Sequence, residues 1–276
     1  EGGVNIFYNE WDGYAAQWLH NLSNDGHIPK GIVCEKSITD LTPNDLDGYD
    51  QCHFFTGIGG WLLALRWSGL EGVSGIWTGS PPCQPFSTAG KKLGVKDERH
   101  LAPTWIELIR AKKPPIIFGE QVADAIKHGW IDDLFHELEA EGYSCGFAVL
   151  PACSVGAFHT RKRIFFGAAR VGNASKIYDQ WNKDKLSCEQ KRIRPQRLQA
   201  RLPNSFSMPN IWGNYEIISF EHYNEKRFCK PGIPLLVNGI PGTVGGISGY
   251  GNAIVPQVAC FFIEQFMESI GDMLRE

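Results

Sequence analysis

A cysteine on a proline-rich loop is the residue of this sequence with the clearest potential for chemistry. The stretch from Gly79 to Ser87 reads GSPPCQPFS and follows an apolar run, Val73 to Trp77, that predicts a strand. Proline fixes φ and removes a backbone donor, so the chain leaves regular structure close to the Cys83 thiol. A thiolate on such a loop can act as a nucleophile when its surroundings lower its pKa. The alternative is a structural thiol, because free cysteine is among the most buried residue types.

A carboxylate and two guanidinium groups follow at places where they could serve the same reaction. Glu120 comes directly after the apolar run 114–119. Strand ends in open α/β sheets face the active site, so the Glu120 side chain is expected near Cys83. Arg161 and Arg163 alternate before another apolar run, and on one strand both side chains point to the same face. Two parallel guanidinium groups would suit a carbonyl, a phosphate or the Glu120 carboxylate, and a solvated edge strand is the alternative.

Two stretches have the composition of a nucleotide site. Thr56 to Gly60 reads TGIGG between a predicted strand, Cys52 to Phe55, and an apolar helix. Glycines let a ligand approach the backbone and the helix N-terminus. Glu10 ends a predicted strand over 5–9, where a carboxylate can accept hydrogen bonds from a ribose, and Trp11 could lie flat on an adenine. A tight turn without a ligand, an exposed acid and a packed tryptophan are the alternatives.

These stretches together resemble the motifs of DNA cytosine-5 methyltransferases. The resemblance covers most of the chain, and the order and spacing of the motifs are more specific than any one of them. It implies an α/β fold with a doubly wound, mostly parallel, Rossmann-like sheet. It also implies transfer of a methyl group from S-adenosylmethionine to carbon-5 of cytosine in DNA, leaving S-adenosylhomocysteine. The matching residues are 82–87, 90–92, 97–99, 118–122, 161–163 and 251–256.

The resemblance further implies a role for each catalytic residue. Cys83 would add to carbon-6 of cytosine and so activate carbon-5 as a nucleophile. Glu120 would hydrogen-bond the ring near N3, while Arg161 holds the base carbonyl with Arg163 as support. Because the reacting carbons are stacked inside duplex DNA, the base must be flipped out. No metal ion is required.

Cofactor contacts are implied at several separate places in the chain. Most members of the family have an Asp that holds the adenine amino group where this chain has Ser37. Glu35 and Asp40 lie nearby in the sequence, so that contact is not assigned to one side chain. The implied cofactor residues are Phe55, Gly57, Gly59, Gly60, Glu10, Trp11, Ser37, Ile38, Pro81, Asn252 and Ala253.

The order of these motifs departs from the family. In most members the glycine turn comes before the Glu-Trp strand, whereas here it comes after it. We interpret this as a permuted start, in which the ribose and adenine strands precede the glycine turn while their positions in the sheet are kept. The alternative is that the match at Glu10 and Trp11 is coincidental.

Contacts with double-stranded DNA must be local, because the formal net charge of the chain is −3. Residues 176–201 hold eight Lys or Arg against three acids, and residues 90–100 read as a mobile loop that could close on the DNA backbone. The short recognition region leaves room for a target sequence of about two to four base pairs. The expected DNA-binding residues are Gln84, Ser87, Lys91, Arg99, Lys191, Arg192 and Arg194.

The length and composition fit one large α/β domain with a small appendage. We expect a catalytic domain over 4–170, an irregular target-recognition region over 171–232 and a returning segment over 233–276, while residues 1–3 read as a cloning remnant.

Eight Cys without a CxxC pair predict reduced thiols, no zinc site and a cytoplasmic location. No apolar run approaches the roughly 18 residues of a membrane span, and a monomer is expected.

Two other classes of function stay open at this point. One is a catalytically silent DNA- or nucleotide-binding module of the same fold, which would lack the nucleophile. Cys83, Glu120 and Arg161 are all present, which favours the enzyme. The other is a nucleotide-dependent oxidoreductase that uses the glycine turn. Transfer of a labelled methyl group to DNA, against hydride transfer with a nicotinamide, separates the two.

Overall fold

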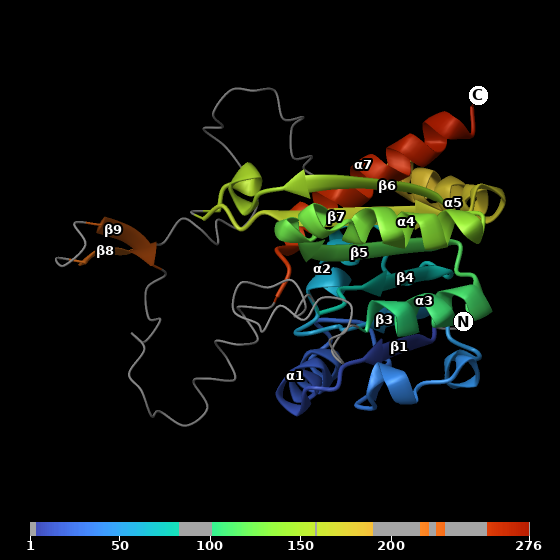
Figure 1. Ribbon diagram of the computed structural model, residues 1–276, viewed down its shortest axis with the longest axis horizontal. Coiled ribbons are helices and arrows are strands. Elements are labelled where there is room, and N and C mark those ends of the chain that lie inside the picture. The colour runs from blue at the N-terminus through green and yellow to red at the C-terminus, as the bar shows by residue number, and fades with distance from the viewer. Residues whose placement is uncertain are drawn as a thin grey trace.

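One sheet with helices on both faces forms the body of the protein (Figure 1). The computed structural model describes residues 4–82, 101–157, 159–189, 216–220, 225–229 and 253–275. The strands are β1 (Ile6–Asn9), β2 (Ile32–Cys34), β3 (Gln51–Phe54), β4 (Ile76–Gly79), β5 (Ile116–Val122), β6 (Ser144–Leu150), β7 (Arg163–Ala169), β8 (Glu216–Phe220) and β9 (Glu225–Cys229). The α-helices are α1 (Gly13–Asn24), α2 (Gly60–Ser68), α3 (Ala102–Lys112), α4 (Trp130–Ala140), α5 (Val171–Glu189) and α7 (Pro256–Met273). Short 3₁₀ helices are η1 (Ile38–Asp40), η2 (Pro43–Leu46), η4 (Ala123–His128) and η5 (Ala152–Val155).

The strands of the main sheet lie in the order β2-β1-β3-β4-β5-β7-β6. The first five are parallel, whereas β7 runs antiparallel to both β5 and β6. The predicted doubly wound, mostly parallel α/β sheet is therefore confirmed. In the usual doubly wound order, 3-2-1-4-5-6, the first strand of the chain lies beside the fourth. In this sheet β3, rather than β1, lies beside β4. Strands β8 and β9 pair separately as an antiparallel two-stranded sheet.

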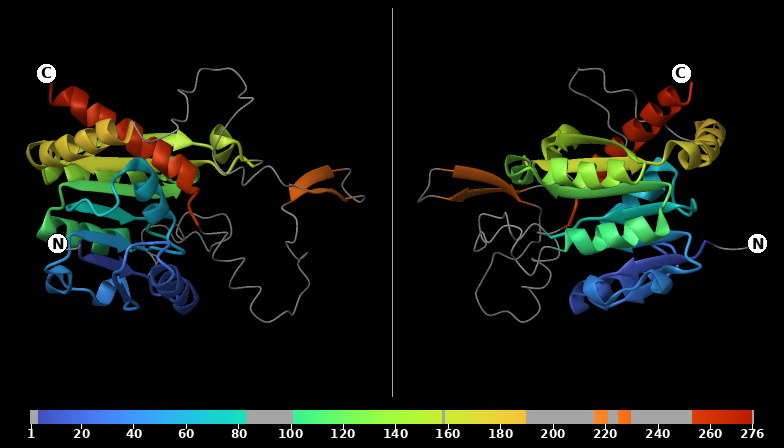
Figure 2. Two further views of the ribbon diagram at one scale, coloured as in Figure 1. Left: turned by 180° about the vertical axis from the view of Figure 1, so that it is seen from behind. Right: turned by 45° about the vertical axis from the view of Figure 1, so that its right-hand side comes forward.

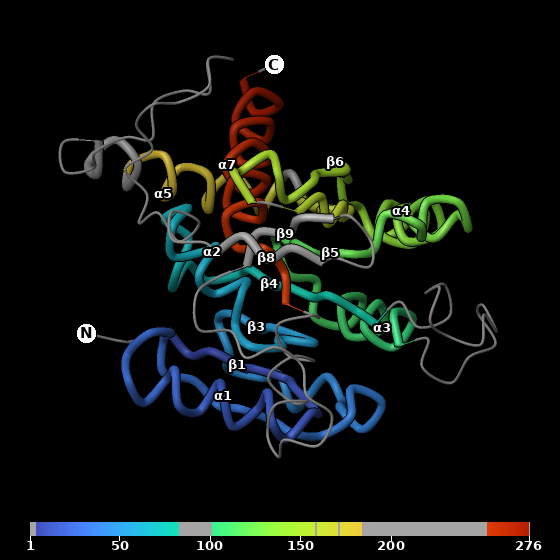
Figure 3. Tube along the Cα trace, turned by 90° about the vertical axis from the view of Figure 1, so that its left-hand side faces the viewer, coloured from blue at the N-terminus to red at the C-terminus, as the bar shows by residue number. Residues whose placement is uncertain are grey.

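Strand residues divide between two cores, because successive side chains of a strand point to opposite faces. In β5, Ile117 packs in a core covered by α3 and α4, together with Phe54 and Trp105. Ile116 and Phe118 pack in a second core covered by α2, α5 and α7. Figure 3 shows α3 and α4 on one side of the sheet and α2 and α5 on the other, and the left view of Figure 2 shows α5 and α7 across that second face. Burial on both faces explains the nearly continuous apolar runs of these strands.

Glycines near the ends of β4 and β5 leave room for aromatic rings to pack directly on the sheet. A Cβ on Gly79 would lie 2.5 Å from the Trp105 ring, and one on Gly119 would lie 2.0 Å from the Phe166 ring. Gly79 and Gly119 are also partners in the parallel register of these strands. A larger residue at either position would displace a packed ring, so glycine keeps the two strand ends close to their covering side chains.

The chain after β7 departs from the sequence prediction. Irregular structure was expected from Val171 onward, but residues 171–189 form α5. Ala174, Ile177 and Trp181 are buried in the core shared with α7, and the Trp181 indole N–H donates to the Ser68 carbonyl at 2.8 Å. These three apolar residues share one helix face, although most residues of the segment are polar or charged. No helix among the described residues is both long and apolar enough to cross a bilayer.

His53, a residue of β3, is fully buried beside β4. The Nδ1 atom of His53 lies 2.9 Å from the Thr78 Oγ1 atom, and the ring stacks on Tyr8 with centroids 5.6 Å apart. Burial lowers the pKa of His53 to about 3, because the interior disfavours the charged imidazolium. In the unfolded chain the pKa of histidine is about 6.5. The folded protein therefore keeps His53 neutral at pH values where the unfolded chain takes up a proton.

This difference predicts a loss of stability in acid. The stabilising effect of a neutral His53 is fully present above about pH 6.5 and declines as the pH falls toward 3, since the unfolded state then binds more protons. Between pH 7 and pH 5 the free energy of unfolding should fall by about 2 kcal/mol through this group. His53→Asn keeps a hydrogen-bonding group near Thr78 and cannot titrate, so urea denaturation should show a smaller fall in that variant. Equal falls in both proteins would contradict the assignment.

Candidate functional site

The carboxyl ends of the parallel strands meet at one edge of the sheet. The residues that follow β1, β3 and β4 all lie there, since these strands are neighbours and run in the same direction. The Gly57 N–H after β3 donates to the Glu10 carboxylate after β1 at 2.7 Å. On β5, Gln121 donates from its side-chain amide to the Pro81 carbonyl after β4 at 3.2 Å. Segments far apart in the sequence are thus joined directly at this edge.

The glycine turn between β3 and α2 has an unusual backbone. Phe55, Gly57 and Gly59 all have positive φ, at 51°, 55° and 85°. Glycine tolerates this conformation, whereas Phe55 adopts it at a cost in strain. Thr56 is buried, and its hydroxyl lies within hydrogen-bonding distance of the His53 carbonyl at 2.8 Å and the Asn9 carbonyl at 3.1 Å. Sequence reasoning did not single out Thr56, although it fastens the turn to the ends of β3 and β1.

Glu10 lies beside this turn, and Trp11 follows it in the chain. One oxygen of the Glu10 carboxylate accepts from Gly57, and the other accepts from the Asp12 N–H at 3.0 Å. Burial raises the pKa of Glu10, while the backbone hydrogen bonds from Asp12 and Gly57 act in the opposite direction. Trp11 is 75% exposed, so the face of its indole ring is accessible at the surface. The pair therefore offers a fixed carboxylate and an accessible aromatic ring.

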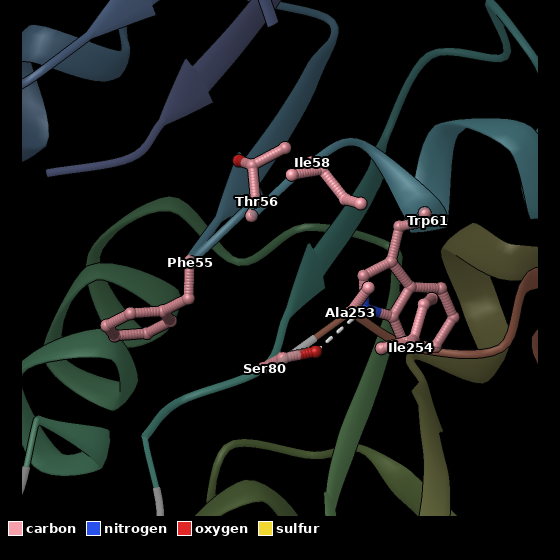
Figure 4. A pocket seen from close by; sticks show the side chains of 9 residues that line it. Phe55, Thr56, Ile58, Trp61, Ser80, Ala253 and Ile254 are labelled. Carbon is pink, nitrogen blue, oxygen red and sulfur yellow. Dashed lines mark hydrogen bonds between the residues drawn. The ribbon is translucent and has the colours of Figure 1, made fainter. Parts of the chain in front are cut away.

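A pocket opens at the N-terminus of α2 (Figure 4). Among the predicted cofactor residues, Phe55, Gly57, Gly60 and Ala253 line it. A Cβ on Gly60 would lie 2.6 Å from Ile254 Cγ1, so glycine at this position lets the segment before α7 approach the helix. The remaining lining residues are Thr56, Ile58, Trp61, Ser80 and Ile254.

Ser80 and Trp61 are members of the pocket that sequence reasoning missed. The Trp61 indole N–H donates to the Ser80 hydroxyl at 2.9 Å, and Figure 4 shows the two side chains together. This bond joins the start of α2 to the residue that follows β4. The apolar character of Trp61 indicated only a core position, and nothing in the local sequence of Ser80 signals its partner.

Three further predicted cofactor residues, Ser37, Ile38 and Gly59, have local partners. Ser37 caps η1, with its hydroxyl 2.8 Å from the Thr39 hydroxyl. Ile38 is 2% exposed and packs in the core with Leu41 and Leu46. Gly59 packs beside α1, where a Cβ would lie 3.4 Å from the Leu19 side chain. The roles of Ser37, Ile38 and Gly59 toward a cofactor stay predictions.

The buried Glu120 carboxyl forms an ion pair with Arg163, whose side chain is partly exposed. Glu120 Oε1 lies 2.9 Å from Arg163 Nε, and the Glu120 residue is 8% exposed. Burial raises the pKa of Glu120 to about 7, because the cost of removing the charge from water outweighs the opposing attraction of Arg163 and Arg161. Glu120 lies within β5, opposite Phe165 of β7, rather than beyond the strand end as predicted. Near neutral pH the carboxyl can therefore hold or release a proton.

Arg161 and Arg163 do not alternate on one strand, so that prediction is wrong. Strand β7 begins at Arg163, whereas Arg161 has a φ of 24°, which is incompatible with extended backbone. The Arg161 guanidinium instead donates to the Ala253 carbonyl at 2.8 Å. Arg161 still lies close enough to Glu120 for its charge to lower the pKa of that carboxyl. The two guanidinium groups reach the same region from different backbone conformations.

The remaining predicted site residues lie outside the described residues, and their roles stay predictions. Within the described residues, no group of three or more His, Cys, Asp or Glu side chains is arranged to hold a metal ion. The predicted residues outside are Cys83, Gln84, Ser87, Lys91, Arg99, Lys191, Arg192, Arg194 and Asn252.

Comparison with known proteins identifies a matching family and several relatives. Residues 71–230 match the family model of the C-5 cytosine-specific DNA methylases. The type II methyltransferase M.HaeII of Haemophilus aegyptius is 31% identical over 189 residues, which cover 66% of this chain and 47% of that protein. The type II methyltransferase M.NgoBI of Neisseria gonorrhoeae is 30% identical over 168 residues, covering 59% of this chain and 43% of that protein. The chain thus spans about half the length of these curated relatives.

Solved structures of methyltransferases also resemble part of the chain. The S. pombe Dnmt2 methyltransferase matches with a TM-score of 0.39 and 16% identity, covering 60% of this chain and 50% of that one. The Entamoeba histolytica methyltransferase EhMeth matches with a TM-score of 0.35 and 16% identity, covering 62% of this chain and 54% of that one.

The ion pair with Arg163 predicts how the pKa of Glu120 responds to substitution. Arg163→Met removes the main positive charge beside the carboxyl, so the pKa of Glu120 should rise by about one unit or more above its value of about 7. Infrared difference spectroscopy with ¹³C-labelled glutamate can follow the carboxyl band against pH, and loss of that band in Glu120→Gln would assign it. Arg66→Met, which removes a surface partner of Glu71, should leave the band unchanged. A lowered or unchanged pKa in Arg163→Met would contradict the electrostatic account.

Proposed function

The chain belongs to the C-5 cytosine-specific DNA methylase family, and from this we propose that it methylates carbon-5 of cytosine in double-stranded DNA. The observation that carries the proposal is the Glu120–Arg163 pair, whose carboxyl has a pKa of about 7. Glu120 lies on β5, the strand beside β4, and Cys83 comes four residues after the end of β4 in the sequence. A proton-carrying carboxyl, a guanidinium group and a thiol are the groups that this reaction needs.

The proposed reaction begins with the Cys83 thiolate. Carbon-5 of cytosine is a poor nucleophile, and a bond from the Cys83 sulfur to carbon-6 converts the ring into an enamine. Glu120 hydrogen-bonds N3 and donates its proton as negative charge develops there. The pKa of about 7 makes both the protonated and the ionised carboxyl available at neutral pH. After methyl transfer, water takes the carbon-5 proton, the sulfur–carbon bond breaks to restore the thiolate, and N3 returns its proton to Glu120.

The guanidinium groups take different proposed roles from those first predicted. Arg163 is the direct partner of Glu120, so we assign Arg163 to the base carbonyl. Arg161 bonds to Ala253, which lines the pocket at α2, so its support for the site is indirect. The positive charges of Arg163 and Arg161 both lower the pKa of Glu120, whereas burial raises it. Duplex DNA would have to release the target base from its stack for these contacts to form.

The pocket at α2 suits S-adenosylmethionine, which would supply the methyl group as a sulfonium. Gly57 has a positive φ and open space where a Cβ would be, so the backbone of the turn is accessible to a ligand. Ala253 and the N-terminus of α2 would receive the methionine end. Glu10 would accept hydrogen bonds from the ribose, and the exposed Trp11 ring would cover the adenine. The residue that holds the adenine amino group is not assigned.

The sheet supports the proposed permutation of the cofactor motifs. The strand before the glycine turn, β3, lies between β1 and β4, although it is third in the chain. A permuted chain would give this arrangement, because Glu10 and the turn remain neighbours while their order in the sequence is exchanged. The bond from Gly57 to Glu10 joins the two motifs directly.

DNA recognition is proposed for the part of the chain after α5. Helix α5 packs in the second core, with α2 and α7, so we place the start of the target-recognition region near residue 190 rather than at 171. Lys191, Arg192 and Arg194 would then contact phosphates, with Lys91 and Arg99 near the site. We propose that the protein binds DNA as a monomer and reads a short target sequence.

The first test of this function is the replacement of the proposed nucleophile. Cys83→Ser should lower methyl transfer to DNA by more than about a thousandfold, because a neutral hydroxyl is a far weaker nucleophile than a thiolate. Cofactor binding and the melting temperature should stay close to those of the wild type. Cys153→Ser, which changes an exposed thiol on η5, should leave turnover unchanged. Wild-type turnover in Cys83→Ser would exclude the covalent route.

A second test concerns the proposed adenine contact. Trp11→Ala should weaken binding of S-adenosylhomocysteine about tenfold, since stacking of a base on an aromatic ring contributes roughly 1–3 kcal/mol. Titration calorimetry without DNA measures this affinity directly. Phe147→Ala removes another exposed aromatic ring, from the edge strand β6, and should leave the affinity unchanged. Equal affinities in the Trp11 variant and the wild type would show that the N-terminal strand contributes to packing and makes no contact with the cofactor through Trp11.

A further inference from the structure

The hydrogen-bond ladder between β4 and β5 stops where the proposed thiol loop begins. Gly79 and Gly119 are the last paired residues of the two parallel strands. Two residues farther on, Pro81 would stand opposite Gln121 if the register continued. Pro81 and Pro82 have no backbone N–H, so neither can donate to a ladder. The start of this loop must therefore be held through its carbonyl groups or its side chains.

The side chain of Gln121 supplies the missing connection. Gln121 is 3% exposed, and its Nε2 atom donates to the Pro81 carbonyl at 3.2 Å. Its Oε1 atom accepts from the Val122 N–H at 2.8 Å, which fixes the orientation of the amide group. Both ends of the amide are thus engaged, one on β5 and one on the chain after β4. The bond from Gln121 to Pro81 therefore links β5 to the chain after β4, beyond the last backbone pair of the two strands.

The bond between Gln121 and Pro81 lies close in the sequence to both proposed reacting groups, the Glu120 carboxyl and the Cys83 thiol. Gln121 directly follows Glu120 on β5, and Pro81 lies two residues before Cys83 in the sequence. The reaction requires a carboxyl at N3 and a sulfur at carbon-6 of the same ring. A misplacement of about 1 Å between such groups can reduce the rate about a hundredfold. We propose that Gln121 is a positioning residue, which fixes the start of the Cys83 loop relative to the Glu120 carboxyl; this inference rests on the proposed methyl transfer.

Gln51 provides a matched control within the same sheet. It is 1% exposed on β3, and its Nε2 atom donates to the Leu70 carbonyl at 3.0 Å and the Val73 carbonyl at 2.6 Å. Gln51 is thus a buried amide bonded to backbone carbonyl groups, like Gln121. Its bonds hold the turn after α2, away from the carboxyl ends of the strands. Loss of either amide should reduce stability, but only loss of Gln121 should affect the chemistry.

The test measures the rate at which DNA becomes covalently attached to the protein. A duplex with 5-fluorocytosine at the target position is the probe, because its carbon-5 carries no proton to lose after methyl transfer and the adduct persists. Gln121→Met and Gln51→Met are compared with the wild type at saturating S-adenosylmethionine and DNA. Rapid quench into denaturant gives the rate of adduct formation. Calorimetry and thermal denaturation give cofactor affinity and stability for the same proteins.

Gln121→Met should form the adduct about 10–100-fold more slowly than the wild type, with cofactor and DNA affinities within about threefold. Gln51→Met should form it at close to the wild-type rate, even where its melting temperature falls further. A wild-type rate in Gln121→Met, or an equal loss of rate in both variants, would overturn the positioning role. If the wild-type protein forms no adduct while it binds both ligands, the proposed function fails and the inference fails with it.

Discussion

The site depends on the burial of one carboxyl group beside a guanidinium group. A carboxylate removed from water is strongly destabilised unless it is paired or protonated, and Glu120 at 8% exposure meets this constraint with Arg163. The pairing requires β7 to lie antiparallel beside β5, so that Arg163 at its start meets Val122 at the end of β5. The antiparallel part of the sheet therefore creates a group that can exchange a proton near neutral pH. Its pKa of about 7 reflects incomplete compensation of burial by the two arginines.

The parallel half of the sheet supplies the second part of the site and is joined to the first by a few specific bonds. The glycine turn after β3 and the segment before α7 form a pocket, in which Gly60 allows Ile254 to approach α2. Arg161 connects that pocket to the region of Glu120 through the Ala253 carbonyl. Gln121 connects β5 to Pro81 in the same region. The pocket and the region of Glu120 are therefore connected by side-chain hydrogen bonds to the backbone carbonyl groups of Ala253 and Pro81.

The sequence predicted the sheet, the glycine turn and the position of Glu10 because those features depend on local pattern and on the rule that parallel strand ends meet. Helix α5 was missed because most of its residues are polar or charged. Among its described side chains the buried ones are Ala174, Ile177 and Trp181, too few to give a clear periodicity. The conformation of Arg161 was missed because a positive φ in a non-glycine residue depends on tertiary contacts, here with Ala253. Partners formed between distant segments leave no local signal, so the bonds of Gln121 and Thr56 could not be predicted.

Identification of the methylated atom tests the central claim most directly. The wild-type protein, S-adenosylmethionine with a ¹⁴C-labelled methyl group and a duplex of random sequence would be incubated together, and the DNA digested to nucleosides. Chromatography against standards then separates 5-methylcytosine from N4-methylcytosine and N6-methyladenine. We predict that the label is recovered as 5-methylcytosine. Label on an exocyclic nitrogen would contradict the account, because that product requires neither attack at carbon-6 nor a carboxyl at N3.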